Sequence, residues 1–161
     1  MSDTAYEERI VRTMEAFRRN RYDVLRFAER TATADYLVRE IRGKRVGFGD
    51  SETLRALSLY ERLSVHNEVI DPPRAGHVGG IEAFLAAGRE ALMTDIFVLS
   101  ANAITEEGQI LNMDGAGNRV AGSLFGHEKT YFVVGINKLV PNIEAGIDRI
   151  HRIAAPRNAQ R

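Results

Sequence analysis

A six-residue stretch near the middle of the chain combines residue types that bind anions. It reads DGAGNR from Asp114 to Arg119 and leads into an apolar run with helical spacing. Glycines allow a tight turn, Asn118 can cap the following helix, and the first amide groups of a helix point outward. Arg119 adds a side chain that can donate two hydrogen bonds to one carboxylate or phosphate. The same residues are also typical of an ordinary turn and N-cap, so both interpretations stay open.

A second glycine turn follows the first predicted strand, Arg45 to Phe48. It contains Gly47 and Gly49, and Ser51 is placed to cap a helix predicted from Glu52 to about Leu63. A strand, a glycine turn and a capped helix in this order can hold a phosphate or carboxylate. A single G-x-G is as typical of a plain turn as of a binding loop. Its position after a strand favours binding, because open α/β sheets place ligands beyond the carboxyl ends of their strands.

Polar residues also follow two strongly apolar runs. Ile96 to Leu99 predicts a buried strand, which Asn102 follows closely. Thr130 to Ile136 predicts another strand, which ends at Asn137 and Lys138. Because the carboxyl ends of parallel strands meet at one edge, we expect these polar residues to lie near the two glycine turns.

We therefore expect one site for a small anion at this edge. Asp114 is the best candidate for a general base, although it is equally typical of an aspartate that stabilises its own turn. Lys138 suits a carboxylate or phosphate and is equally typical of an exposed loop lysine. The predicted catalytic residues are Asp114 and Lys138, and the predicted substrate-binding residues are Gly47, Gly49, Ser51, Asn102, Thr105, Gly117, Asn118, Arg119 and Asn137.

Strands that alternate with helices predict an α/β fold, a three-layer α/β/α sandwich around a mainly parallel sheet. Residues 1–44 are expected to form an N-terminal helical segment that packs on the same domain as the α/β part, residues 45–161. The chain is then a single domain overall. Residues 103–113 predict a small antiparallel insertion, a hairpin with Glu106 and Glu107 at its turn.

Hydrophobic spacing, glycine and proline predict the other elements. Helices are predicted for residues 4–28, 33–41, 81–93, 118–124 and 142–153, and a strand is predicted for residues 65–70. The glycine-rich residues 74–80 are predicted to form a loop. In the last helix, Ile143, Ile147 and Ile150 are expected to face inward.

Composition limits the possible functions. The 161 residues include 22 basic and 22 acidic side chains, which cancel, so the net charge gives no reason to expect nucleic-acid binding. Without cysteine, the chain has no disulfide, thiolate nucleophile or cysteine-ligated iron–sulfur cluster of its own. The four histidines lack the spacing of metal ligands, so we expect no metal site. No apolar stretch approaches the length of a membrane span, and the charged N-terminus is unlike a secretory signal, so we expect a cytoplasmic protein that is not membrane-bound.

Several separated motifs resemble the LUD domain family, which is named for lactate utilisation. The motifs are VGFGDSETL from Val46 to Leu54, NAIT from Asn102 to Thr105, EG at Glu107, DGAGNR, FG at Phe125, VVGINK from Val133 to Lys138 and AAPRNA from Ala154 to Ala159. They occur in the family's order, and the resemblance covers about residues 46–161. The turn from Gly47 to Ser51 is also similar to the phosphate loop of ribose-phosphate isomerases. The resemblance implies the NagB/RpiA/CoA transferase-like fold that the LUD family shares with these isomerases.

The resemblance implies a protein of lactate utilisation or other small-carboxylate metabolism. Oxidation of a hydroxy acid needs a redox centre, and the chain has neither a cysteine cluster nor a dinucleotide-binding fingerprint. We therefore expect no cofactor in this chain, a small anionic metabolite as ligand, a homo-oligomer, and an iron–sulfur redox partner protein that takes the electrons. Two other classes stay open: a sugar-phosphate isomerase-like or CoA-transferase-like enzyme, and a non-catalytic ligand-sensing or assembly module.

Overall fold

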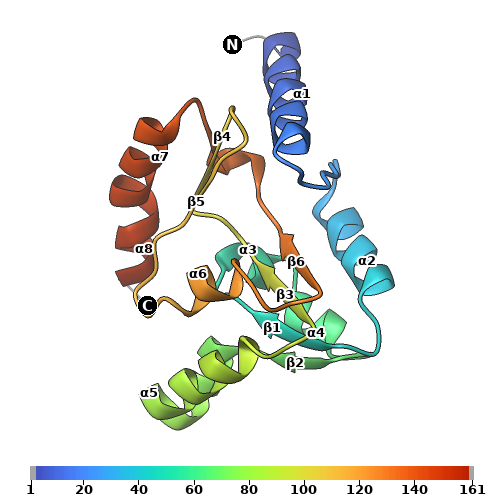
Figure 1. Ribbon diagram of the computed structural model, residues 1–161, viewed down its shortest axis with the longest axis vertical. Helices are drawn as coiled ribbons and strands as arrows, with labels where there is room; N and C mark the ends of the chain where they lie inside the picture. Colours follow the sequence, from blue (N-terminus) through green and yellow to red (C-terminus); the bar gives the residue numbers. More distant parts are fainter. Residues whose placement is uncertain (1–2, 160–161) are drawn as a thin grey trace. The chain divides into compact units, whose positions relative to one another are not determined.

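The computed structural model describes residues 3–159 (Figure 1). Its internal contacts divide the chain into two compact units, each built from stretches that lie far apart in the sequence. Unit 1 contains the described parts of Met1–Arg26 and Gly135–Arg161 together with Ala101–Met113, and unit 2 contains Phe27–Ser100 and Asp114–Val134. That residues 1–44 pack on one domain with residues 45–161 stays a prediction. The helices found within residues 3–159 are too short or too polar to cross a lipid bilayer.

Unit 2 is built around a parallel sheet, sheet A, as the sequence predicts. Its strands are β1 (Arg45–Phe48), β2 (Glu68–Ile70), β3 (Ile96–Leu99) and β6 (Lys129–Phe132), in the order β2-β1-β3-β6. Every neighbouring pair is parallel. The predicted strands at residues 45–48 and 96–99 are confirmed, and β2 is shorter than the predicted residues 65–70.

Helices cover both faces of sheet A, which confirms three layers within unit 2. The helices are α2 (Arg30–Glu40), α3 (Glu52–Ala56), α4 (Leu59–Leu63), α5 (Pro72–Ala91) and α6 (Asn118–Gly122). Val46 and Phe48 belong to a core that they share with apolar residues of α2, α3 and α4. Phe97 and Leu99 belong to a second core, which includes Ala91 of α5. Because successive side chains of a strand point to opposite faces, the fully apolar β3 serves both cores, with Ile96 and Val98 in the first and Phe97 and Leu99 in the second.

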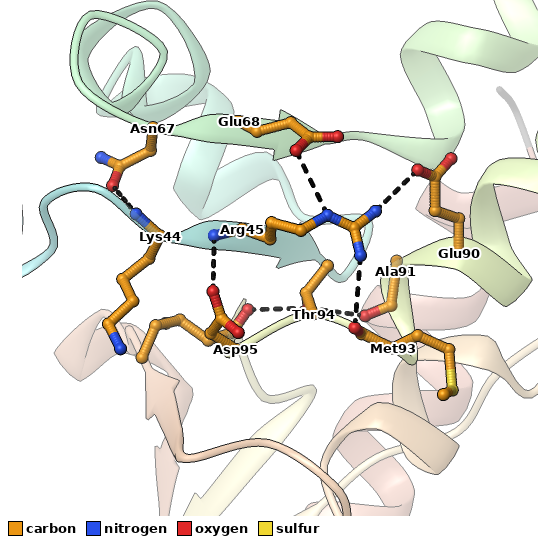
Figure 2. Close-up of polar contacts among 10 residues, drawn as sticks. Lys44, Arg45, Asn67, Glu68, Glu90, Ala91, Met93, Thr94 and Asp95 are labelled. Carbon is orange, nitrogen blue, oxygen red and sulfur yellow. Dashed lines mark hydrogen bonds and ion pairs between the residues drawn. The ribbon is translucent and has the colours of Figure 1, made fainter.

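Polar contacts fasten the amino ends of these strands (Figure 2). The guanidinium of Arg45 lies 3.2 Å from the Glu68 carboxylate and 2.8 Å from the Glu90 carboxylate. The backbone amide of Arg45 donates to Asp95 at 2.8 Å. The exposed ion pairs contribute little each, but the bond from the Arg45 amide joins β1 to the residue directly before β3. These contacts therefore fasten this end of sheet A.

Two predicted helices are longer than the observed ones. The helix predicted for residues 4–28 ends earlier, as α1 (Asp3–Arg19), because Arg21 takes a positive φ of 66°. Residues 52–63 form α3 and α4 instead of one helix, because Ser58 has a φ of 49°. A residue with positive φ cannot continue a right-handed helix, so each of these residues interrupts it.

The loop predicted for residues 74–80 is wrong, because these residues belong to α5. The Asp71 side chain caps this helix by accepting from the Arg74 amide at 3.4 Å, and Pro72 lies in its first turn. Proline suits that position, where its missing N–H would have no helical partner. The proline pair that ends β2 therefore also begins a helix, and the glycines appear only as a break at Gly80, with φ 69°.

Unit 1 contains a small mixed sheet, sheet B. Its strands are β4 (Ala103–Thr105), β5 (Ile110–Leu111) and β7 (Leu139–Val140), and its helices are α1, η1 (Ile136–Lys138), α7 (Ile143–Arg149), η2 (Ile150–Ala154) and α8 (Ala155–Ala159). β4 pairs antiparallel with β5 and parallel with β7. The predicted antiparallel insertion is therefore confirmed as the β4–β5 hairpin, and β7 makes the sheet mixed.

The closing helix of the chain begins as the sequence predicts but buries less. Asn142 caps α7 by accepting from the Ala145 amide at 2.9 Å. Ile150 is buried, whereas Ile143 and Ile147 are 42% and 46% exposed. The expectation that all three isoleucines face inward is therefore wrong for two of them.

Within unit 1, α1 lies against the tip of the β4–β5 hairpin. A Cβ atom at Gly108 would lie 2.8 Å from the backbone of Ala16, and Gly108 has a φ of 81°. The side-chain amide of Asn20 donates to the carbonyl oxygen of Gly108 at 2.9 Å. Arg9 lies 2.6 Å from the carboxylate of Glu106. The hairpin tip is therefore packed backbone against backbone on α1, and only glycine fits there.

Gly108→Ala is expected to lower the free energy of unfolding by about 2–4 kcal/mol, because the added Cβ meets the α1 backbone at a residue with positive φ. Gly43→Ala is the matched control. Gly43 also has a positive φ, 63°, but nothing lies within 4 Å of its missing Cβ, so the expected loss is about 1 kcal/mol. Urea denaturation measures both losses, and equal values would contradict the close contact.

Candidate functional site

The residues of the predicted site are divided between the two units. Unit 2 contains Gly47, Gly49, Ser51, Asp114, Gly117, Asn118 and Arg119, and unit 1 contains Asn102, Thr105, Asn137 and Lys138. Within unit 2, most of the predicted residues gather at the carboxyl edge of sheet A. Within unit 1, they lie on sheet B and on η1.

The turn after β1 places Ser51 at the carboxyl edge of sheet A. The Gly49 amide donates to the carbonyl oxygen of Val98 at 2.9 Å, which keeps this turn beside β3. Ser51 is buried, and its hydroxyl oxygen accepts from the Thr53 amide at 3.1 Å. Ser51 therefore caps α3, as the sequence predicts.

Arg119 lies over the same turn. A Cβ atom at Gly49 would be 2.8 Å from Cγ of Arg119, so the absence of a side chain at Gly49 makes room for the arginine stem. Arg119 belongs to the first turn of α6, after Asn118 and the N-cap Gly117, whose φ is 84°. The structure therefore brings the two glycine turns of the sequence together within unit 2.

Asp114 holds Arg119 in this position. Its Oδ1 lies 2.7 Å from both Nε and Nη2 of Arg119, and its Oδ2 accepts from the Val120 amide at 2.6 Å. The side chains of Asp114 and Arg119 are only 8% and 13% exposed, so water screens the pair poorly. Because both carboxylate oxygens accept hydrogen bonds here, the geometry favours a positioning role for Asp114. Its role as a general base stays a prediction.

Ser100 and Thr53 add two hydroxyl groups to this edge. Ser100 directly follows β3 and is buried, and its hydroxyl donates to that of Thr53 at 3.4 Å. The contact joins the end of β3 to the first turn of α3. The predicted site omitted both residues, although the position of Ser100 directly after an apolar strand was a signal.

Two carboxylates, Asp50 and Asp71, follow β1 and β2 at the same edge. Burial by itself would lower the pKa of Arg55. The nearby carboxylates of Asp50 and Glu52 have a larger combined effect, so the pKa of Arg55 is raised. Burial raises the pKa of the Asp71 carboxyl, and the hydrogen bond from the Arg74 amide offsets only part of this effect. A carboxyl group with a raised pKa beyond a strand end is a candidate acid–base group, which sequence reasoning missed.

Gly47 lies inside β1 and not in the turn. A Cβ atom there would be 2.5 Å from the carbonyl oxygen of Ala91 and 2.8 Å from the hydroxyl of Thr94. The missing side chain therefore lets sheet A approach the end of α5 closely. This position favours a packing role for Gly47, and its predicted contact with substrate stays a prediction.

In unit 1, Asn102 and Thr105 shape the β4–β5 hairpin. The side chain of Asn102 accepts from the Met113 amide at 2.8 Å, and the Asn102 amide donates to the Asn112 side chain at 3.0 Å. Thr105 is buried, and its hydroxyl donates to the Gln109 side chain at 2.7 Å. These contacts favour structural roles for both residues.

Asn137 and Lys138 lie on η1 in unit 1. The strand predicted for residues 130–136 ends at Phe132, so these two residues do not follow a strand end as expected. Asn137 is exposed. The Lys138 ammonium donates to the carbonyl oxygen of Ala101 at 2.8 Å, at the start of the hairpin.

Arg149 of α7 is a cation in unit 1 that sequence reasoning missed. Its guanidinium donates to the carbonyl oxygen of Asn102. Burial lowers the pKa of Arg149, and the positive charge of Arg157 adds to the effect. Among residues 4–157, no carboxylate forms an ion pair with Arg149. The sequence alone does not show that Arg149 is partly buried, because an arginine in a helix usually lies in solvent. Its contacts in the folded chain show it.

Asp71→Asn is expected to change the pH dependence of stability. Burial raises the pKa of Asp71 in the folded protein above its pKa in the unfolded chain. As the pH rises through these two pKa values, the carboxyl ionises and its burial lowers the free energy of unfolding. Below both pKa values the carboxyl is protonated and has no such effect. Asparagine keeps a capping oxygen without the charge. The unfolding free energy of the variant, relative to the unchanged protein, should therefore be higher at about pH 7 than at about pH 3.5.

Urea denaturation at the two pH values measures this difference. Asp23→Asn is the control, because Asp23 is exposed, and its substitution should shift stability little at either pH. If the free energy of unfolding of Asp71→Asn, relative to the unchanged protein, is instead higher in acid than at neutral pH, burial does not raise the pKa of Asp71.

Among the described residues, no three histidine, aspartate or glutamate side chains are grouped so that they could hold a metal ion. The LUD domain family model matches residues 10–161, a span that includes every motif noted in the sequence. No curated protein and no solved structure matches the chain. The NagB/RpiA/CoA transferase-like fold therefore stays a prediction, while the family prediction is confirmed. The chain belongs to the LUD domain family.

Proposed function

We propose that this LUD domain protein acts in lactate utilisation and binds a small hydroxycarboxylate anion at the carboxyl edge of sheet A in unit 2. The observation that carries the proposal is the Arg119 guanidinium, which Asp114 fixes over the Gly49 turn. A guanidinium suits a carboxylate because its planar fork can donate two parallel hydrogen bonds. Since a buried partner already orients Arg119, little conformational entropy remains to be lost when a ligand binds.

Other groups at this edge suit the hydroxyl end of such a ligand. The hydroxyls of Ser100 and Thr53 would orient the ligand's hydroxyl or carbonyl oxygen, together with Asn118. Asp71 is the group best suited to move a proton, because burial raises its pKa towards the working pH. Asp114 is the alternative base. For Asn102, Thr105, Asn137 and Lys138 of unit 1, a role in binding or catalysis stays a prediction.

Oxidation of a hydroxy acid to a keto acid removes two electrons and two protons, and this chain has no cysteine to ligate an iron–sulfur cluster. We propose that a separate iron–sulfur protein accepts the electrons and that this chain binds and orients the substrate. The proposal includes a homo-oligomer in the cytoplasm. The proposal is supported by the match of the LUD domain family model to residues 10–161.

A second candidate function is proton transfer in a sugar-phosphate isomerase-like or CoA-transferase-like reaction. The observation that favours it is the Asp71 carboxyl, whose pKa is raised by burial beside the turn after β1. Such reactions need a carboxyl group that exchanges a proton near neutral pH and a site that holds an anionic group. They need no redox partner.

Replacing the ion pair by an amide pair, Asp114→Asn with Arg119→Gln, should weaken anion binding without unfolding the protein. Arg119→Ala alone would leave the buried Asp114 carboxylate unpaired, at a cost of about 3–5 kcal/mol, which the double variant avoids. We expect the dissociation constant for lactate, measured by calorimetry, to rise at least about tenfold.

Arg39→Gln is the matched control, because Arg39 is an exposed arginine of α2 whose ion pair with Glu40 is also exposed. It should bind lactate as the unchanged protein does. A folded double variant with an unchanged dissociation constant would show that the anion binds elsewhere.

The ligand class can be read from thermal stability. A ligand with a dissociation constant of about 1 mM, added at about 10 mM, contributes roughly 1.4 kcal/mol and raises Tm by roughly 3–6 °C for a chain of this size. We expect lactate to raise Tm more than ribose 5-phosphate or acetyl-CoA does. A larger shift with ribose 5-phosphate would favour the isomerase, and a larger shift with acetyl-CoA would favour the transferase.

A further inference from the structure

A depression of about 370 Å³ lies on unit 2, on the segment that joins α6 to β6. It is lined by Leu124, Phe125, Gly126, His127 and Thr130. This volume is near the lower end of the range for small-molecule sites. The segment leads into the amino end of β6, whereas Ser51 and Ser100 follow the carboxyl ends of β1 and β3. The depression is therefore distinct from the site proposed for the anion.

The imidazole of His127 is held in one orientation beside this depression. Its ring stacks on the buried Phe97, with ring centroids 4.9 Å apart and planes inclined by 23°. Its Nδ1 lies 2.7 Å from the carbonyl oxygen of Thr94. Thr94 is itself fixed, because its hydroxyl donates to the carbonyl oxygen of Ala91 at 2.8 Å (Figure 2).

These contacts determine which nitrogen of His127 carries the proton. A carbonyl oxygen can only accept a hydrogen bond, so Nδ1 must be the protonated nitrogen. In the neutral ring, Nε2 is then an acceptor with a lone pair. Nε2 is buried, and no protein group within the described residues donates to it. Buried acceptors are rarely left without a donor, so this atom is fitted to receive one from outside the chain.

Two large apolar side chains stand beside this acceptor. Leu124 is 77% exposed and Phe125 is 93% exposed. Because they bury so little surface, they can shift at small cost to admit a ligand to the wall that contains His127. Once in contact, they would cover an apolar ring, and Phe125 could stack on it. The depression thus combines an apolar surface with one fixed hydrogen-bond acceptor.

We propose that this depression binds a small neutral ring compound that carries an O–H or N–H group, such as a phenol or an indole, with that group donating to His127 Nε2. Lactate also has a hydroxyl, but the residues that line this depression include no lysine or arginine to bind its carboxylate, so the depression favours a neutral ring over the anion that Arg119 is proposed to hold. The two proposals rest on different residues and different chemistry, and either can fail without the other.

The test is an NMR titration of the ¹⁵N-labelled full-length chain with phenol and with anisole. Both have the same ring, but anisole carries a methyl group in place of the hydroxyl proton. We expect phenol to shift the amide signals of residues 124–130 and the Nε2 signal of His127. We expect anisole to bind at least about tenfold more weakly, because it cannot satisfy the buried acceptor. Benzoate, which is ionised at neutral pH, should leave these signals unchanged.

Phe125→Ala provides a variant that keeps the fold, because the side chain is almost fully exposed. It should weaken phenol binding several-fold and leave Tm unchanged. Equal binding of phenol and anisole would overturn the proposal, and so would phenol shifts spread over the whole surface. A protonated Nε2 in the free protein, or unchanged phenol binding in Phe125→Ala, would overturn it as well.

Discussion

The buried ion pair between Asp114 and Arg119 is the contact on which the carboxyl edge of unit 2 depends. It fixes the guanidinium at 2.7 Å from one carboxylate oxygen, and the other oxygen holds the Val120 amide of α6. The arginine stem then occupies the space that a side chain at Gly49 would need. Removing the charge of Arg119 would leave the Asp114 carboxylate buried without its cation, which costs more than the pair contributes. One ion pair and one missing Cβ therefore couple two glycine turns that lie far apart in the sequence.

The two ends of sheet A differ in their polar contacts, and the anion proposal rests on this difference. At the amino end, the Arg45 amide donates to the Asp95 carboxylate, and the Thr94 hydroxyl donates to the carbonyl oxygen of Ala91 in α5 (Figure 2). At the carboxyl end, β1 and β3 lead into small polar residues, Ser51 and Ser100, at the starts of helices and turns. Parallel sheets bind ligands at that end, because there the chain turns away from the sheet and leaves polar groups at its edge. The anion proposal follows this division.

Sequence reasoning identified the features that depend on local pattern. The strands at residues 45–48 and 96–99, the β4–β5 hairpin and the Ser51 cap all follow from residue order within a few positions. It failed where a local signal had two meanings: the glycines of residues 74–80 suggested a loop, but Asp71 and two prolines start a helix there, which is broken only at Gly80. It also missed Asp71 and Arg149 as site candidates, because burial and partners give them their altered pKa values, and neither is visible in the sequence.

Arg149 in unit 1 differs from Arg55 and Arg119 in unit 2 in how its charge is satisfied, and this bears on how each could meet an anion. In unit 2, Arg55 and Arg119 are each paired with carboxylates, so a ligand there would gain from directed hydrogen bonds more than from net charge. In unit 1, Arg149 bonds to a carbonyl oxygen, and its charged neighbour is Arg157. The pKa of Arg149 is lowered by burial, yet arginine stays charged at any physiological pH. An anion beside Arg149 would therefore offset a positive charge that burial and a like charge both oppose.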